Sequence, residues 1–383
     1  MLILDKLKEL VTKQSNLKLE ESNDKVIQKQ IAKDESNQFQ VGTVIVNQGI
    51  TEERARNIFE EMIPQALINH TQDAYRTANG RIDKLETVVM PRIMGIDGAL
   101  AMFADPAFQI LLRKAQQTAA ATEREDDYNL LSELLVCHIQ KGEDRKNRTG
   151  ISKAIEIVDD IDNDALCALT LVHAVSKYLP VTGNIKEGFQ VLDDLFEKLL
   201  YMTPPEGVEW IEHLDVLGAV RITQLGNFKK IKEYFTEQLS GYACVGLKVD
   251  SEEYKNAIEL LSGVNLSSNL LVSHELMEGY ARLPVPNKKA ISEMTMISFG
   301  TIRKINTQEI TVLEKIWDLY SRDTLLENSV CEEFIQLWDS FTSLKQLHMW
   351  WESIPISFDI TKVGTVLAHT NAKRCDQHIP DLL

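Results

Sequence analysis

The pattern of apolar and polar positions predicts helices along most of the chain, most clearly over residues 103–139. Asp105 followed by Pro106 predicts a helix start. An aspartate accepts hydrogen bonds from the first-turn amides, and proline at the first helical position loses no needed donor. Apolar residues then recur at steps of three and four, the spacing of one helix face. These residues are Phe108, Leu111, Leu112, Ala115 and Ala119.

A second helix completes a helical hairpin in this stretch. Thr122 and Glu125 have the capping-box spacing, so we expect this helix to begin near Glu123. The acidic residues of its first turn complement the helix dipole, and we favour this role over a metal or acid–base cluster. Similar patterns elsewhere predict a mainly α fold, a multi-helix bundle of amphipathic helical hairpins. The apolar side of the second helix consists of Leu130, Leu131, Leu134, Leu135 and Ile139.

A few short stretches have the composition of β-strands instead. Residues 40–47 contain a β-branched run bounded by glycine and asparagine, and residues 354–360 form a similar run. Residues 244–249 and 297–305 are weaker candidates. The strand near 40–47 must pair either within the chain or with the same strand of another subunit, and both alternatives stay open. Its candidate interaction residues are Val41, Val44, Ile45 and Val46.

Composition shifts predict three parts of the chain. Residues 1–38 combine a short N-terminal helix with a polar segment that we interpret as a mobile tether. Pro204, Pro205 and Gly207 form the strongest break. We therefore predict a strand plus an N-terminal helical domain over 39–203 and a C-terminal helical domain over 204–383.

Charge argues against nucleic acid and membrane partners. The 383 residues carry 41 Lys and Arg against 57 Asp and Glu, a net charge of −16 that repels phosphate backbones and anionic lipid. The densest basic stretch, Lys141 to Arg148, is interrupted by Glu143 and Asp144 and contains no aromatic residue to stack a base. We interpret it as a solvated helix face.

Cysteine usage and hydropathy indicate a cytoplasmic protein. The five cysteines are isolated and form no CxxC pair, which supports neither a zinc knuckle nor a disulfide framework. No apolar run reaches the roughly 18 to 20 residues that a membrane span needs. We expect reduced thiols, no membrane attachment and no cofactor.

One pattern suggests metal chemistry. Glu209 and His213 are four residues apart, and His274 and Glu278 repeat that spacing. Two such pairs on facing helices would suit a dimetal site in a helical bundle, and hence a metal-dependent hydrolase. However, known bundle sites use a three-residue Glu-to-His spacing, and acidic helical chains produce such pairs by chance. His173, inside an apolar helix, fits a satisfied core residue better than a ligand.

The C-terminal part holds four of the five tryptophans, after residue 316. Trp338, Trp350 and Trp351 are candidates for a partner-binding surface, although tryptophan is usually buried and an aromatic core is the favoured interpretation. A strand followed by a capped helix at the end of the chain also fits a winged-helix-like DNA-binding regulator, which the negative charge opposes.

Several segments together resemble a known group of proteins. The stretches QVGTVIVNQGIT, FADPAFQILLRKAQ, LLSELL and ITKVGTVLA cover roughly a quarter of the chain. They resemble a loosely characterised bacterial all-helical family associated with anti-phage defence genes. The resemblance implies a bacterial cytoplasmic protein with a role in defence, and it carries no catalytic residues because each stretch is a packing or capping motif.

The sequence contains no phosphate-binding GxxxxGK[ST] loop, no GxGxxG, no GxSxG and no HExxH motif. We therefore expect a non-enzymatic interaction protein that forms a homo-oligomer or binds another protein.

Overall fold

The computed structural model describes residues 52–96, 99–141, 145–223, 226–298 and 301–381. The chain divides into two compact units, Met1–Asn79 and Gly80–Leu383. Helix α2 (Glu52–Met94) contains this division. The predicted tether at 1–38 and the predicted strand near 40–47 lie outside the described residues.

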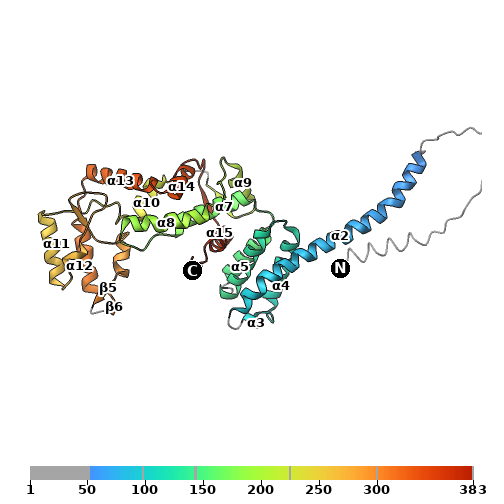
Figure 1. Ribbon diagram of the computed structural model, residues 1–383, viewed down its shortest axis with the longest axis horizontal. Helices are drawn as coiled ribbons and strands as arrows, with labels where there is room; N and C mark the ends of the chain where they lie inside the picture. The colour runs from blue at the N-terminus through green and yellow to red at the C-terminus, as the bar shows by residue number, and fades with distance from the viewer. Residues whose placement is uncertain (1–51, 97–98, 142–144, 224–225, 299–300, 382–383) are drawn as a thin grey trace, which may run out of the picture. The chain divides into compact units, whose positions relative to one another are not determined.

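Helices make up most of the second unit, which confirms the mainly α prediction (Figure 1). Two short 3-10 helices, Ser268–Leu270 and Lys288–Glu293, supplement them. After α2, the helices are α3 (Ala99–Met102), α4 (Pro106–Ala121), α5 (Glu125–Lys141), α6 (Arg145–Glu156), α7 (Asn163–Lys177), α8 (Ile185–Leu199), α9 (Glu209–Val216), α10 (Ile231–Gln238), α11 (Glu252–Gly263), α12 (Thr307–Asp318), α13 (Thr324–Asp339), α14 (Thr342–Glu352) and α15 (Lys362–Cys375).

In the hairpin of α4 and α5, the predicted start of α4 is confirmed, whereas the predicted start of α5 is not. Asp105 caps α4 by accepting a hydrogen bond from the Ala107 amide at 3.0 Å, as predicted. The predicted capping box at the start of α5 is wrong, because Thr122 donates to Asp127 and accepts from the Arg124 amide. The helix consequently begins at Glu125, two residues later than expected.

Three small antiparallel sheets accompany the helices in the described part of the chain. Strand β1 (Val220–Ile222) pairs with β7 (Phe358–Ile360), with Val220 opposite Ile360, which confirms the strand predicted near 354–360. The other two sheets confirm the weaker strand prediction at 244–249, whereas the stretch 297–305 covers parts of two paired strands and not one strand. They are formed by β2 (Leu247–Lys248), β4 (Tyr280–Arg282) and β3 (Val272–Ser273) in that order, and by the hairpin of β5 (Thr295–Ser298) and β6 (Thr301–Lys304).

The described residues of the second unit form two hydrophobic cores. The larger includes side chains from both sides of the Pro204–Gly207 break, such as Leu199 and Trp210. The smaller lies around α11 and α12 and includes Leu261 and Leu313. The domain boundaries that the sequence predicts, between residues 38 and 39 and between residues 203 and 204, stay predictions.

Helix α15, near the end of the chain, packs against α5, α6 and α7. Figure 1 shows it beside α5 and α7. These three helices precede it by more than 180 residues, so the end of the chain returns to the first half of the second unit. In the part of the chain that the structure describes, no helix has the length and apolar character to cross a bilayer.

Candidate functional site

A cavity of about 340 Å³ lies against α7, α15 and the segment that follows α15. Histidine, tyrosine and lysine side chains dominate its wall. The lining residues are His173, Lys177, Tyr178, Lys362, Thr365, His369, Pro380 and Asp381.

Different local features position α7 and α15 at this cavity. α7 is apolar around its whole circumference and is buried from Ala165 to Val175, as expected of a helix at the centre of a core. α15 is capped by Thr361, whose side chain accepts from the Gly364 amide at 3.2 Å. A Cβ on Gly364 would lie 2.0 Å from the Ala219 carbonyl oxygen, so only glycine allows this close approach.

Two imidazoles and a phenol form the centre of the site. The Tyr178 hydroxyl lies 2.9 Å from His369 Nδ1, and the His173 and His369 ring centroids are 5.9 Å apart in an edge-on arrangement. His173 is 2 % exposed and His369 is 6 % exposed. The Nε2 atom of each ring has no hydrogen-bond partner among the described residues. Such buried, unsatisfied polar atoms are rare in folded proteins and call for an explanation.

Burial controls protonation here. Burial, with smaller contributions from His369 and Lys177, lowers the pKa of His173 to about 4. Burial and the charge of Lys373 lower the pKa of His369 to about 4. Burial also raises the pKa of the Tyr178 hydroxyl well above its usual range. At neutral pH both imidazoles are therefore uncharged and the phenol keeps its proton.

The protonated phenol bears on the tautomer of His369. If the Tyr178 hydroxyl donates to Nδ1, the ring proton of His369 resides on Nε2, the atom without a partner among the described residues. In that tautomer His369 offers a hydrogen-bond donor and no net charge.

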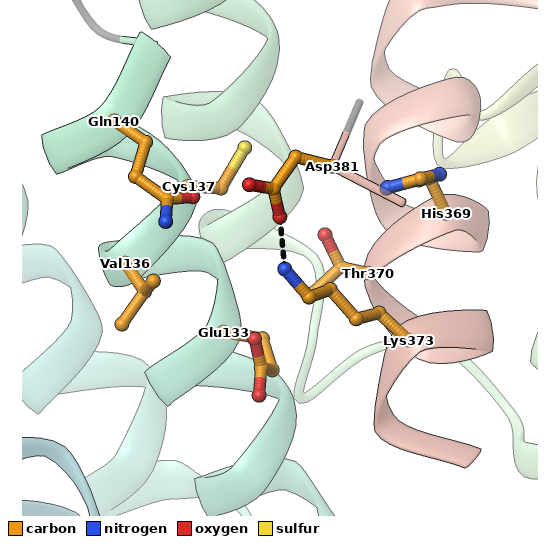
Figure 2. A pocket seen from close by; sticks show the side chains of 8 residues that line it. All are labelled: Glu133, Val136, Cys137, Gln140, His369, Thr370, Lys373 and Asp381. Atoms are coloured by element: carbon orange, nitrogen blue, oxygen red, sulfur yellow. Dashed lines mark hydrogen bonds and ion pairs between the residues drawn. The ribbon is translucent and has the colours of Figure 1, made fainter. Parts of the chain in front are cut away.

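A smaller neighbouring pocket lies between α5 and α15 (Figure 2). Glu133 and Gln140 extend into it from α5, and Lys373 extends from α15 to form an ion pair with Asp381. Since Asp381 lines both pockets, the segment after α15 forms a shared wall. In this ion pair the carboxylate of Asp381 neutralises the positive charge of Lys373. Lys177 and Lys362 have no carboxylate partner among the described residues.

The predicted metal-site residues do not form a ligand set. Glu209 and His213 lie on α9 as predicted, and His213 Nε2 accepts from the Asp162 amide at 3.3 Å. The assumption that His274 and Glu278 lie on a helix is wrong, since they lie in the connection between β3 and β4. His274 Nε2 is 2.6 Å from the Cys244 carbonyl oxygen. The described part of the chain contains no cluster of three or more His, Cys, Asp or Glu side chains suited to a metal ion.

The predicted interaction residues divide into two groups. Val41, Val44, Ile45 and Val46 lie outside the described residues. Trp338, Trp350 and Trp351 are core residues with exposed fractions of 0 %, 7 % and 6 %, so they provide little surface to a partner. Each indole N–H donates to a backbone carbonyl, of Leu344, Pro205 and Lys229 respectively, at 2.9 Å.

The sequence correctly predicts that His173 lies in the core, but the prediction that it is satisfied there is wrong, because its Nε2 atom has no partner among the described residues. The neighbours Tyr178 and His369 were not predicted. The available signal was a second isolated histidine, His369, inside another helix of small and apolar residues. Nothing in the linear pattern indicated that the two helices pack together.

Comparisons with known proteins show a family for this chain, but they indicate no activity or ligand. No curated protein and no solved structure matches the chain. One protein-family model, whose description reads only ":-like", matches residues 49–380. That description names no reaction, ligand or partner. Because the match spans well over half of the chain, the protein belongs to this family.

Proposed function

We propose that this protein is a non-enzymatic binding protein that holds a small anion in the cavity between α7 and α15. The observation that carries the proposal is the pairing of two buried imidazoles, whose Nε2 atoms lack partners among the described residues, with Lys177 and Lys362 on the same cavity wall. A bound oxyanion would accept from the two ammonium groups, and it would reach an imidazole N–H once a ring turns, because the Nε2 atoms have almost no accessible surface in this structure.

The protonation states favour binding over acid–base catalysis. A general base near neutral pH needs a pKa close to 7, whereas His173 and His369 have pKa values of about 4. Neutral imidazoles and an un-ionised phenol are hydrogen-bonding groups that orient a ligand. The cavity volume of about 340 Å³ is near the lower end of small-molecule sites and suits a ligand with one carboxylate or phosphate group.

The test is thermal unfolding of the full chain in increasing inorganic phosphate or acetate. We expect at least one anion to raise the Tm, because a ligand that binds only the folded state stabilises it. The double variant Lys177→Ala/Lys362→Ala should lose most of this increase. The control Lys186→Ala/Lys289→Ala removes two exposed lysines that do not line the cavity, and it should respond like the unchanged chain. Equal responses of the two double variants would reject the site.

A second candidate function is self-association, and it depends on the predicted strand near 40–47. The described α2 side chains from Thr71 to Asn79 are exposed apart from Ala78, which is half-buried. Tyr75, 48 % exposed, is the one large apolar side chain among them, so this stretch has the composition of a solvated helix. The homo-oligomer expected from the sequence stays a prediction.

Light scattering coupled to size exclusion tests self-association in the full chain. If the strand near 40–47 mediates it, Val44→Lys/Val46→Lys should lower the oligomer mass, because residues two apart share one strand face. Val181→Lys, at an apolar position that is 94 % exposed, is the control and should leave the mass unchanged. The role in anti-phage defence implied by the sequence resemblance stays a prediction within this proposal.

A further inference from the structure

A second groove, of about 350 Å³, lies between α4, α5 and α6 and shares no lining residue with the histidine cavity. Its floor is apolar. Leu111 is buried there, and Ile110 at the edge is 60 % exposed. Arg145, Arg148 and Lys153 contribute the cationic side of the groove.

The two arginines are unusual in a chain of net charge −16. Neighbouring cations are paired, for example Lys114 with Glu156 and Lys153 with Glu156. Arg145 and Arg148 have no carboxylate partner among the described residues. An arginine guanidinium presents a fork of donors that matches a carboxylate in a bidentate manner, so two arginines without a carboxylate partner in the described part of the chain favour an anionic occupant of the groove.

His138 lines the same groove, although its Nδ1 atom has almost no accessible surface. It is 4 % exposed, its ring stacks on Phe108 at 6.0 Å, and its Nδ1 atom has no partner in the described part of the chain. Burial and the charge of Arg148 lower the pKa of His138, while the nearby Asp105 opposes this shift. The groove therefore combines cationic, neutral polar and apolar groups.

The shape and lining of the groove favour a peptide over a small molecule or a nucleic acid as its occupant. Ile110, Arg145, Thr149 and Lys153 are exposed at its edge, so the groove is open to solvent along one side. Small-molecule sites usually enclose most of their ligand. Single-stranded nucleic acid is usually held by stacking aromatic side chains, which are absent from the described residues that line this groove, and the net charge of −16 repels any phosphate backbone. A peptide that carries acidic side chains beside an apolar one matches both the charge and the exposed apolar floor.

We propose that the groove between α4, α5 and α6 docks an acidic peptide segment of a partner protein, with Arg145 and Arg148 binding its carboxylates and Ile110 contacting an apolar side chain. This goes beyond the anion cavity, since the two sites share no residue and either can exist without the other.

The test is an array of short immobilised peptides in which Glu and Leu positions are permuted, probed with the full chain. A matched array carries Lys in place of Glu. Peptides that bind are then measured in solution by fluorescence polarisation. The variant Arg145→Glu/Arg148→Glu should weaken binding by about tenfold or more, since two charge pairs become repulsive. Ile110→Ser should weaken it less.

The control variant Lys186→Glu/Lys289→Glu changes the net charge equally at two exposed positions outside the groove and should bind like the unchanged chain. The charge-reversed Arg variant should gain binding to Lys-containing peptides that the control variant, of equal net charge, does not gain, so non-specific attraction to an acidic chain cannot explain the gain. If no Glu–Leu peptide binds, or if the two charge-reversed variants bind equally, the proposal is overturned.

Discussion

Burial sets the chemistry of His173 and His369 at the scale of single residues. Among the groups that shift the pKa of His173 most strongly, no carboxylate stabilises a positive charge. For His369, Asp381 acts in that direction but is outweighed by burial and Lys373. The uncharged state therefore persists in the folded protein at a pH where an exposed histidine would be protonated.

This difference predicts a pH dependence of stability. Because the folded-state pKa of each histidine is about 4 and the unfolded value is near 6.5, their stabilising contribution is complete above about pH 6.5 and is lost as the pH falls toward 4. His369→Gln should make the slope of unfolding free energy against pH shallower by about 1.4 kcal/mol per pH unit between these values. Urea unfolding across this range measures the slope.

The control for that slope is His378→Gln, because the His378 side chain is 92 % exposed. His378→Gln should change the slope less than His369→Gln does. A His369→Gln slope equal to that of the unchanged chain would contradict the assignment of a neutral, buried imidazole.

A buried arginine provides a second prediction at the residue scale. The Arg282 side chain is fully buried, pairs with Glu275 at 2.8 Å and donates to the Gly183 carbonyl oxygen at 2.7 Å and the Gly241 carbonyl oxygen at 3.3 Å. Arg282→Ala should cost about 3 kcal/mol or more of unfolding free energy, since it leaves these acceptors without a donor. Urea unfolding measures the loss.

Lys288→Ala is the matched control for Arg282, because its ion pair with Asp318 is exposed on both sides. It should cost less than about 1 kcal/mol. Similar losses in the two variants would show that Arg282 contributes no more than a surface charge.

At the scale of elements, local rules explain some helix ends and fail at others. The cap of α4 follows a local rule, because Asp105 lies directly before the helix that it caps. The strand near 354–360 has a local composition signal, but it also needs its distant partner β1. Thr122 satisfied the same local rule, yet its hydroxyl pairs with Asp127, and the Arg124 guanidinium reaches the Val158 and Ile161 carbonyl oxygens of a distant turn. Tertiary contacts override a capping pattern there.

α14 shows a cap that no local pattern contains. Its own N-cap residue, Phe341, has no capping side chain, and Asp193 of α8 instead accepts from the Ser343 amide at 2.8 Å and the Leu344 amide at 3.1 Å. Asp193→Ala should destabilise the protein by about 1 to 2 kcal/mol. The adjacent exposed Asp194, which accepts only from Gln190 among the described contacts, is the control. Asp194→Ala should cost less than about 0.5 kcal/mol.

Equal losses in the Asp193 and Asp194 variants, measured by urea unfolding, would contradict the capping role. The comparison is informative because the two substitutions remove the same group from neighbouring positions on one helix.

At the scale of the molecule, the sites arise from packing between distant segments. His173 and His369 each appear in the sequence as an isolated histidine among small and apolar residues, and only the packing of α7 against α15 brings them together. The Trp-rich C-terminal part follows its composition more directly, since large aromatic residues form the core there. Periodicity thus predicts the helices and their buried faces, but it does not specify which buried polar groups meet.

The same limit applies to charge. The stretch Lys141 to Arg148 reads as a solvated helix face in the linear sequence, and in the structure Arg145 and Arg148 line a groove with His138 of the preceding helix. Net charge predicts which partners are disfavoured, whereas the position of these two arginines beside one groove depends on the fold.

The most direct test of anion binding is nitrogen-15 NMR of the histidine rings during titration with the anion that raises the Tm most. We predict that the Nε2 resonances of His173 and His369 shift with saturation, that their shifts report neutral rings at neutral pH, and that His378 stays unaffected. His369 should carry its proton on Nε2. Unchanged His173 and His369 resonances at anion concentrations that saturate the Tm increase would contradict the proposed site.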